Sequence, residues 1–207
     1  MKKSPSSKQW LRRHVDDPYV QRSKREGYRS RAAYKLLEID ERDQLLKPGM
    51  VAVDLGSAPG GWCQVLGKRA VPNGLVVAID LLAMPPVTGV TFLQGDFTQT
   101  RGLLALTEAL GGKKADLILS DMSPNLTGIP FTDQARSMAL AELALDFALE
   151  HLKPGGAFLV KVFQGDGYQE YVKLIKQRFE KVVVRKPNAS RDESAEQYLL
   201  ARVLRQA

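Results

Sequence analysis

Four aspartates each stand at or just after the end of a short apolar run that is rich in β-branched residues. The runs read "MVAVD", "GLVVAID", "VTFLQGD" and "ADLILSD", and their carboxylates are Asp54, Asp80, Asp96 and Asp121. In an open α/β sheet, ligands bind outside the carboxyl ends of the strands. One aspartate in such a place is usually a turn or helix-capping residue. Four in succession predict a single polar crevice along one edge of a sheet.

The glycine loop after the first of these runs indicates which ligand the crevice holds. In "VDLGSAPGGW" the glycines permit a tight turn and a close approach of a ligand to the backbone. The loop departs from G-x-G-x-x-G, and Pro59 removes an amide that a pyrophosphate group would use. Asp80, about 20 residues downstream, suits the two hydroxyls of a ribose. A nucleoside cofactor without phosphates, S-adenosylmethionine, fits this pattern, with Asp96 placed to receive the adenine amino group.

A lysine interrupts one of the most apolar segments of the chain. Residues 155–165, "GGAFLVKVFQG", have the pattern of a central strand covered on both faces, except at Lys161. Burying an unpaired ammonium group costs on the order of several kcal/mol. Lys161 must therefore be paired with an opposite charge or be neutral in this strand.

Alternating strands and helices must position these residues. Helical stretches such as "GWCQVLGKRAV" and "RGLLALTEAL" separate most of the strands, which predicts a mostly parallel sheet with helices on both faces. Only the loop "NASRDESA" separates the last two strands, "EKVVVRKP" and "EQYLLARVL". The last strand is therefore expected to run antiparallel to the others. The length predicts a single domain over residues 1–207, with a basic, partly flexible N-terminal segment at about 1–30.

The charge balance favours a polyanionic partner. The chain has 30 lysines and arginines against 23 aspartates and glutamates, a formal net charge of +7, and such a surplus is typical of proteins that bind nucleic acid. Many of the basic residues lie near the N-terminus, for example in "RSKREGYRSR". The side chains that we expect to contact nucleic-acid phosphates are Lys2, Lys3, Arg12, Arg13, Arg29 and Arg31.

The composition disfavours several other classes of protein. Cys63 is the only cysteine, and the two histidines, His14 and His151, lack ligand spacing, so we expect neither a disulfide nor a metal site. The basic N-terminus has no apolar core of a secretory signal, and no apolar run approaches the ~20 residues that span a bilayer. We therefore expect a cytoplasmic protein with no membrane partner. Nothing in the sequence indicates an obligate oligomer, and we expect a monomer.

Over nearly its whole length the sequence resembles the FtsJ/RrmJ-type family of ribosomal RNA 2′-O-methyltransferases. The resemblance lies in a series of ordered stretches: "RSRAAYKL", "VDLGSAPGGW", "DLLAMPP", "FLQGDF", "SDMSPN", "KPGGAFLVKVFQG" and "VRKPNASRDESAEQYLLA". It implies a Rossmann-like fold with a seven-stranded, mostly parallel sheet, an antiparallel last strand and helices on both faces. It also implies the family's substrate, a uridine of 23S rRNA in the large ribosomal subunit.

The same resemblance assigns roles to individual residues. The family's contacts with S-adenosylmethionine fall on Gly60, Trp62, Asp80, Asp96 and Asp121, and its Lys-Asp-Lys-Glu set falls on Lys35, Asp121, Lys161 and Glu196. Burial habits alone give Trp62 an alternative role, as an aromatic side chain that packs a helix against the sheet.

Two other methyl acceptors are disfavoured by the sequence. Methylation at C5 of a pyrimidine needs a cysteine nucleophile beside the target ring, and Cys63 lies in the helix beneath the predicted cofactor. Methylation of an exocyclic amine typically uses an aromatic residue just after the fourth strand to stack on a flipped base, and "DMSPN" contains none. A hydroxyl acceptor remains, and the ribose 2′-hydroxyl is the group that distinguishes RNA from DNA.

A 2′-hydroxyl acceptor requires proton removal and alignment with the methyl donor. Lys161 is the candidate general base for this proton. The alternative is a charged Lys161 that orients the hydroxyl, with alignment supplying most of the rate. Asp121 would position Lys161, and the resemblance gives Lys35 and Glu196 the task of orienting the ribose.

Three other functions compete with this prediction. Methylation of a tRNA ribose or of an mRNA cap would use the same four residues. A ribosome assembly factor that binds RNA without chemistry would not require all four. A nicotinamide-dependent dehydrogenase is disfavoured by the loop "GSAPGG".

Overall fold

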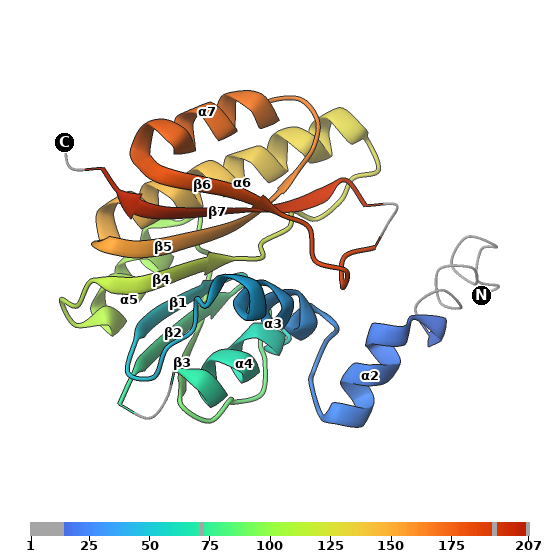
Figure 1. Cartoon of the computed structure of the whole chain (residues 1–207), viewed down its shortest axis with the longest axis vertical. Coiled ribbons are helices and arrows are strands. Elements are labelled where there is room, and N and C mark those ends of the chain that lie inside the picture. Colours follow the sequence, from blue (N-terminus) through green and yellow to red (C-terminus); the bar gives the residue numbers. More distant parts are fainter. Residues whose placement is uncertain (1–14, 71–72, 192–193, 206–207) are drawn as a thin grey trace.

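A seven-stranded sheet forms the centre of the computed structural model, which describes residues 15–70, 73–191 and 194–205 (Figure 1). The strands are β1 (Val51–Leu55), β2 (Leu75–Asp80), β3 (Val90–Gln94), β4 (Ala115–Ser120), β5 (Leu152–Phe163), β6 (Phe179–Arg185) and β7 (Glu196–Leu204). Their order across the sheet is β3-β2-β1-β4-β5-β7-β6. The strand order therefore reverses between β1 and β4. In open α/β folds, ligands bind at the carboxyl ends of the strands next to such a reversal.

Only β7 runs against the direction of the other strands. Strands β1 to β5 pair in parallel, whereas β7 lies between β5 and β6 and is antiparallel to both. This confirms the mostly parallel sheet with an antiparallel last strand. The register between β5 and β7 sets Phe163 opposite Glu196 and Lys161 opposite Tyr198. The start of β7 therefore lies beside the carboxyl end of β5.

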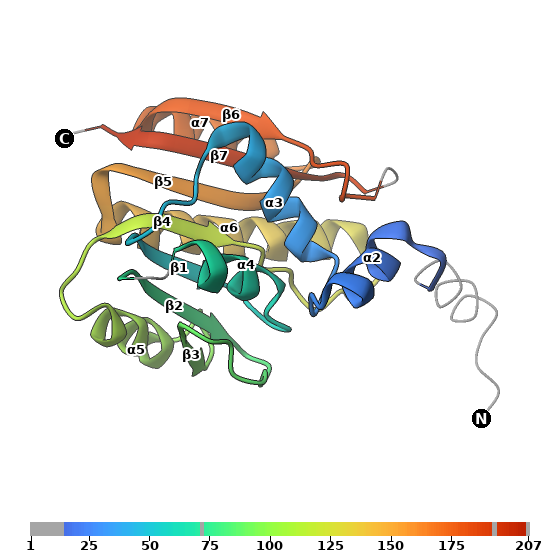
Figure 2. The same cartoon turned by 60° about the horizontal axis from the view of Figure 1, so that its bottom comes forward.

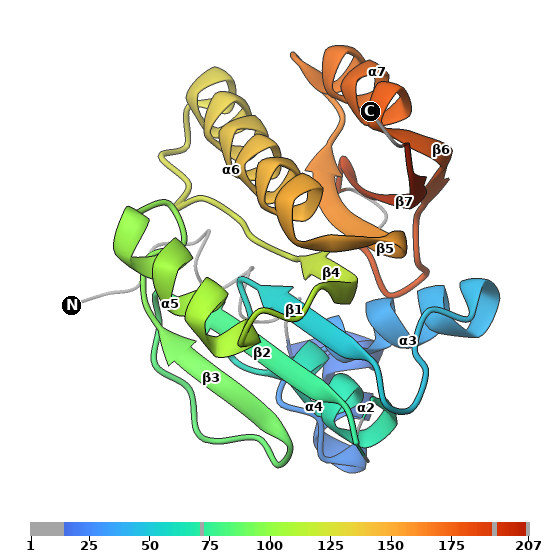
Figure 3. The ribbon, with the colours of Figure 1, turned by 90° about the vertical axis from the view of Figure 1, so that its left-hand side faces the viewer.

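Helices cover both faces of the sheet, as predicted. The helices are α2 (Pro18–Glu26), α3 (Ala32–Asp43), α4 (Gly61–Arg69), α5 (Thr100–Leu110), α6 (Pro130–His151) and α7 (Tyr168–Arg178). Figures 2 and 3 show α3 and α4 on one face and α5, α6 and α7 on the other. Each face has its own buried apolar cluster beneath these helices. Helix α2 lies outside the two layers, at one end of the sheet (Figure 1).

Strand alternation assigns the charged residues to one face. Successive side chains of a strand point to opposite faces. Leu119 of β4 and Leu159 of β5 belong to the cluster beneath α3 and α4, so Asp121 and Lys161, two positions further along, face α3. On β7, Glu196 shares this face with Tyr198, which lies in the same cluster. The face beneath α3 is therefore the one on which the charged groups can meet.

The start of β5 differs from the sequence-based expectation. The apolar pattern predicts a strand within residues 155–165, but β5 starts at Leu152, directly after α6 ends. Its pairing with β4 shifts between Ala115–Leu152 and Leu117–Ala157, so β5 carries extra residues at this point. Lys153 Nζ contacts Asp116 Oδ1 at 2.6 Å there, and this contact joins the extra residues to β4. The irregularity lies at the amino end of β5, away from Lys161.

Across the described part of the chain, none of the helices combines the length and apolar character that crossing a membrane would require.

Candidate active site

Lys35, Asp121, Lys161 and Glu196 form two adjacent ion pairs. Lys35 Nζ lies 2.6 Å from Glu196 Oε1, and Lys161 Nζ lies 3.0 Å from Asp121 Oδ1. Lys161 Nζ also donates to the backbone oxygen of Asp121 at 2.6 Å. The four side chains are between 7% and 18% exposed, so water screens these contacts far less than it screens surface pairs. The buried lysine of β5 therefore has a carboxylate partner, Asp121.

Tyr198 connects the two ion pairs, and sequence reasoning missed it. Its hydroxyl donates to Asp121 Oδ1 at 2.8 Å, and its ring centroid lies 5.7 Å from Lys35 Nζ. Burial, followed by the negative charges of Asp121 and Glu196, raises the pKa of Tyr198 well above its usual value. The phenol therefore stays neutral and remains a donor. The signal in the sequence was its position two residues after Glu196, which sets both side chains on one face of β7.

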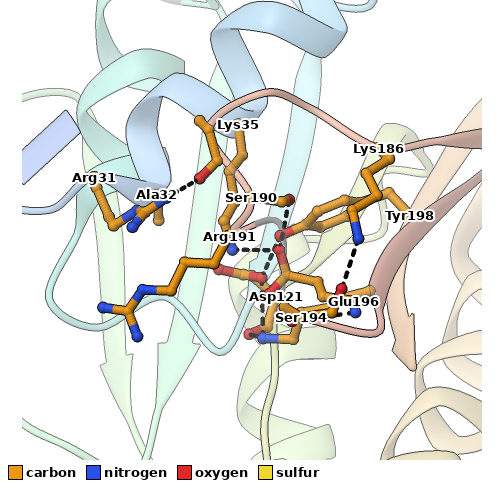
Figure 4. A network of polar contacts seen from close by, with 12 residues as sticks. Arg31, Ala32, Lys35, Asp121, Lys186, Ser190, Arg191, Ser194, Glu196 and Tyr198 are labelled. Atoms are coloured by element: carbon orange, nitrogen blue, oxygen red, sulfur yellow. Dashed lines mark hydrogen bonds and ion pairs between the residues drawn. The ribbon is translucent and has the colours of Figure 1, made fainter. Parts of the chain in front are cut away.

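The loop between β6 and β7 holds Glu196 in place (Figure 4). Ser190 Oγ, which is buried, donates to Glu196 Oε1 at 2.9 Å. Glu38 of α3 accepts hydrogen bonds from the backbone amides of Asn188 at 2.6 Å and Ala189 at 3.2 Å. Helix α3 thus supplies Lys35 and also fastens the loop that orients the carboxylate partner of Lys35.

Asp121 is held in its ionised form. Burial alone would raise the pKa of Asp121, but the charges of Lys161 and Lys35 and the hydrogen bond from Tyr198 outweigh burial, and the net shift is downward. A buried carboxylate is stable only with such partners, because desolvation disfavours the charged form. Asp121 is therefore a fixed negative charge at the carboxyl end of β4.

Two clefts meet at this charged network. The first, about 300 Å³, contains Asp80, Asp96 and Asp121 among its lining residues, and we refer to it as the carboxylate cleft. The second, about 350 Å³, is lined by Arg31, Lys35, Arg191, Ser194 and Glu196, and we refer to it as the basic cleft. Asp121 lines the first cleft, whereas Lys35 and Glu196 line the second. Lys161 and Tyr198 both contact Asp121, and the ring of Tyr198 also lies beside Lys35, so these contacts connect the residues of the two clefts. The network therefore lies where a donor in one cleft and an acceptor in the other would meet.

The residues of the carboxylate cleft fit S-adenosylmethionine. Asp80 Oδ2 accepts from the Ala58 amide and Oδ1 from the Leu82 amide, both at 2.8 Å, so this carboxylate has a fixed orientation. Asp96 Oδ1 accepts from the amide of Thr98 at 2.8 Å and from its hydroxyl at 2.7 Å. No lysine or arginine is among the described residues that line this cleft. Three carboxylates suit hydroxyl and amino donors and a cationic sulfonium, and they repel a pyrophosphate.

Gly60 and Trp62, which were predicted to contact the cofactor, are not among the residues that line this cleft. Gly60 has φ 105°, and a Cβ there would come within 2.8 Å of Arg29 Nη1, so its backbone lies directly beneath that guanidinium. The Trp62 side chain is buried: its Nε1 donates to the Ala32 oxygen at 2.7 Å, and its ring packs 5.8 Å from the ring of Tyr198. In the structure Trp62 is a buried aromatic side chain that packs α4 against the sheet, and its ring contacts the ring of Tyr198.

Asp54, which the sequence analysis predicts to line one polar crevice with Asp80, Asp96 and Asp121, is instead buried and is not among the residues that line the carboxylate cleft. Cys63 Sγ donates to Asp54 Oδ2 at 3.2 Å, and Oδ1, also buried, has no hydrogen-bond partner within the described part of the chain. Burial raises the pKa of Asp54 to about 7, with further contributions from the negative charges of Asp121 and Asp80. Asp54 therefore titrates near neutral pH within the sheet, beneath the glycine loop.

The predicted phosphate contacts divide into three groups. Lys2, Lys3, Arg12 and Arg13 lie outside the described residues. Arg31 lines the basic cleft, where its guanidinium also contacts Asp17 and the Ala189 oxygen. Arg29 has backbone partners instead: its Nη1 donates to the oxygens of Pro85 at 2.6 Å and Pro59 at 3.3 Å, and its Nη2 donates to that of Pro86 at 2.7 Å. Arg29 therefore joins the glycine loop to the loop after β2.

Comparison with solved structures shows which class of protein has this fold. A solved ribosomal RNA methyltransferase from Plasmodium falciparum is 30% identical with a TM-score of 0.75, and the match covers 86% of this chain and 98% of that one. A solved methyltransferase from Streptococcus mutans in complex with SAH, 17% identical with a TM-score of 0.52, shares the fold and covers 80% of this chain and 94% of that one. The fold is thus that of the Rossmann-like methyltransferases.

The family follows from the sequence matches. Residues 28–204 match the model of the FtsJ-like methyltransferase family. Proteins named ribosomal RNA large subunit methyltransferase E are similar over nearly the whole chain: the one from Azoarcus sp. is 60% identical over 205 residues, which are 99% of this chain and 100% of that protein. The one from Methylobacillus flagellatus is 58% identical over 200 residues, 97% of each chain. The chain belongs to the FtsJ-like methyltransferase family, which confirms the resemblance found in its sequence.

Asp54→Asn tests the buried acid through the pH dependence of stability. The folded pKa of about 7 lies above the unfolded value of about 3.9, so the unfolded state loses this proton first as pH rises. Asp54 therefore lowers the free energy of unfolding progressively between those two values. We expect the variant to gain up to roughly 4 kcal/mol relative to the wild type across this interval, measured by urea unfolding without cofactor. Asp146→Asn, on the exposed side of α6, is the matched control, and parallel pH profiles for Asp54→Asn and the wild type would contradict this assignment.

Arg29→Ala tests whether this arginine supports the cofactor cleft. The substitution removes the contacts that hold the glycine loop against the loop after β2, so we expect the dissociation constant for S-adenosylmethionine to rise about tenfold, measured by calorimetry. Arg22→Ala, which removes an exposed ion pair with Glu26 in the same basic segment, should leave this constant unchanged. Unchanged cofactor binding by Arg29→Ala, with weakened RNA binding, would support the prediction that Arg29 contacts phosphates and contradict the role in the cofactor cleft.

Proposed function

We propose that this chain transfers the methyl group of S-adenosylmethionine to the 2′-hydroxyl of a uridine ribose in 23S rRNA of the large ribosomal subunit. The observation that carries this proposal is the buried network of Lys35, Asp121, Lys161 and Glu196 between the carboxylate cleft and the basic cleft. The relatives named as large-subunit ribosomal RNA methyltransferases support the substrate class. Both clefts belong to the same sheet, so we place the activity in a single domain. We also propose that the protein acts as a monomer in the cytoplasm.

The carboxylate cleft is the proposed cofactor site. S-adenosylmethionine, when bound, supplies an electrophilic methyl group on a sulfonium centre. Asp80 would accept from the ribose hydroxyls and Asp96 from the adenine amino group, which places the methionine end toward Asp121. The negative charge of Asp121 suits a sulfonium, and the two loops that Arg29 joins close this side of the sheet.

The basic cleft is the proposed site of the acceptor nucleotide. Lys35 and Glu196 offer a donor and an acceptor side by side, a pair that can hold the hydroxyl groups of a ribose. Arg31 and Arg191 line the same cleft, and their charges suit the phosphates on either side of that ribose. This separation of charge would direct the RNA to the basic cleft and the cofactor to the carboxylate cleft.

Lys161 stands between the two clefts and is the proposed general base. Its Nζ contacts two oxygens of Asp121, and these contacts hold the amino group at the carboxyl end of β5. In this role Lys161 in its neutral form takes the proton of the 2′-hydroxyl, and the resulting charge is balanced by Asp121. In the alternative role a charged Lys161 donates to the hydroxyl oxygen and aligns it. The two roles predict opposite pH profiles, because the first is favoured and the second is lost at high pH.

Two other functions remain as alternatives. A tRNA or mRNA-cap ribose would require the same network with a different surface around it. A ribosome assembly factor would bind RNA without turnover, but it would not require two buried ion pairs at the junction of two clefts. DNA is disfavoured because the proposed acceptor is the hydroxyl that DNA lacks.

Labelled S-adenosylmethionine distinguishes these functions directly. The protein is incubated with isolated large subunits, with free 23S rRNA or with tRNA, and label transfer to each RNA is measured. We expect label in 23S rRNA, and nuclease digestion should recover it in a 2′-O-methyluridine. Label found only in tRNA would overturn the substrate assignment, and no label in any RNA would favour the assembly factor.

Lys161→Met tests the mechanism with a side chain of similar length. Removing a positioned proton acceptor should lower the turnover number by at least about 10²-fold, whereas the dissociation constant for S-adenosylmethionine should change less than about threefold. Lys153→Met, which loses an ion pair at the opposite end of the same strand, is the matched control for folding and charge. Full turnover by Lys161→Met would contradict both proposed roles of this lysine.

A further inference from the structure

The segment that leads from Asp121 to helix α6 exposes three large apolar side chains. Leu126, Ile129 and Phe131 are 76%, 60% and 72% exposed, and we refer to these three residues as the apolar rim. Large apolar groups that stay in water forgo the free energy of burial. Grouped within six residues beside a functional cleft, they mark a surface that contacts another molecule.

Hydrogen bonds to one carboxylate give the loop of the apolar rim a fixed shape. Asp133 Oδ1 accepts from the amide and the hydroxyl of Thr127, both at 2.7 Å, and its Oδ2 accepts from the amide of Gly128 at 3.0 Å. These bonds, that from the Thr127 amide first, hold the pKa of Asp133 below its usual value. The Ile129 amide donates in turn to Thr127 Oγ1 at 3.2 Å. The polar groups of the loop therefore bind one another, while the apolar side chains point outward.

The apolar rim is continuous with the catalytic edge of the sheet. Ser123 and Asn125, in the same loop, line the carboxylate cleft next to Asp121. Gln134, one turn after Phe131, donates to the backbone oxygens of Phe163 at 3.2 Å and Asp166 at 2.9 Å. The start of α6 is thereby tied to the end of β5, two residues beyond Lys161. The start of α6 and Lys161 therefore lie at the same, carboxyl, edge of the sheet.

We propose that the apolar rim binds an unpaired nucleotide of the RNA substrate next to the target ribose, with its base stacked on Phe131. This inference rests on the proposed function and adds a second contact surface to it. Bases of single-stranded RNA stack on exposed aromatic side chains, and neighbouring aliphatic groups cover the remaining base surface.

The charges around the apolar rim favour RNA as the occupant. Residues 122–132, "MSPNLTGIPFT", contain no acidic residue that would repel a phosphate. The nearest carboxylate, Asp133, is already occupied by three donors, and Arg136 is exposed on the following turn of α6. Phe131 is not among the residues that line either cleft, so it suits a neighbouring nucleotide better than the target itself.

Phe131→Ala tests this contact through the RNA affinity. We expect the KM for isolated large subunits, and the dissociation constant for protein-free 23S rRNA in filter binding, to rise about tenfold, with the turnover number and S-adenosylmethionine affinity unchanged. Phe131→Tyr, which keeps the aromatic face, should restore wild-type values. Leu104→Ala, which removes an apolar side chain of α5 that is 57% exposed, is the matched control and should change neither constant.

Phe131→Trp provides a direct signal of stacking. Its emission, corrected for the wild-type signal, should be quenched by a single-stranded oligouridine RNA and not by S-adenosylmethionine alone. Weaker binding of Phe131→Ala to whole subunits but not to protein-free rRNA would assign the rim to a ribosomal protein and overturn the proposal. Unchanged binding of Phe131→Ala to both whole subunits and protein-free rRNA would also overturn the proposal. Because binding and fluorescence are read without turnover, a failure of the proposed methylation would be seen separately.

Discussion

Two buried ion pairs, Lys35 with Glu196 and Lys161 with Asp121, determine much of the arrangement around them. Taking a charge out of water is costly, and removing one partner of a buried pair leaves the other uncompensated, at a cost of about 3–5 kcal/mol. The four charges come from α3, β5, β7 and the end of β4, so each of these elements must keep its place for the other charges to stay paired. Tyr198 and Ser190 add the hydrogen bonds that such pairs need, and Trp62 packs behind Tyr198.

Much of this arrangement could be predicted from the sequence, since it depends on strand patterns. Apolar runs located the strands, the short loop before β7 gave its direction, and the acids at strand ends located the carboxylate cleft. Side-chain alternation also sets Asp121, Lys161 and Glu196 on one face. Sequence patterns did not predict the contacts of Arg29, the role of Tyr198 or the raised pKa of Asp54. The partners of Arg29 are backbone carbonyls, which every residue carries, so residue types do not reveal them. The hydroxyl of Tyr198 and the raised pKa of Asp54 gain their meaning from burial and from neighbours distant in sequence.

The two clefts differ in charge, and in the proposed function this difference would separate the RNA from the cofactor. The carboxylate cleft presents three negative side chains, and the basic cleft presents two arginines and a lysine with one glutamate. A polyanion is attracted to the second cleft and repelled by the first, which leaves the first to a small cationic cofactor. The apolar rim, whose loop also lines the carboxylate cleft, adds an uncharged surface, and we propose that the flat face of a base binds there.

The position of β7 also has a consequence for the order in which the site is assembled. This strand enters the sheet between β5 and β6, although it follows both in the chain. Glu196 and Tyr198 therefore reach Lys35 and Asp121 only after every other strand has been synthesised. Until then, β5 is an open edge, Lys35 lacks its carboxylate, and Lys161 is exposed on an unpaired strand. During synthesis on the ribosome, the proposed catalytic network would therefore stay incomplete until β7 is made, and the addition of β7 would both extend the sheet and complete that network.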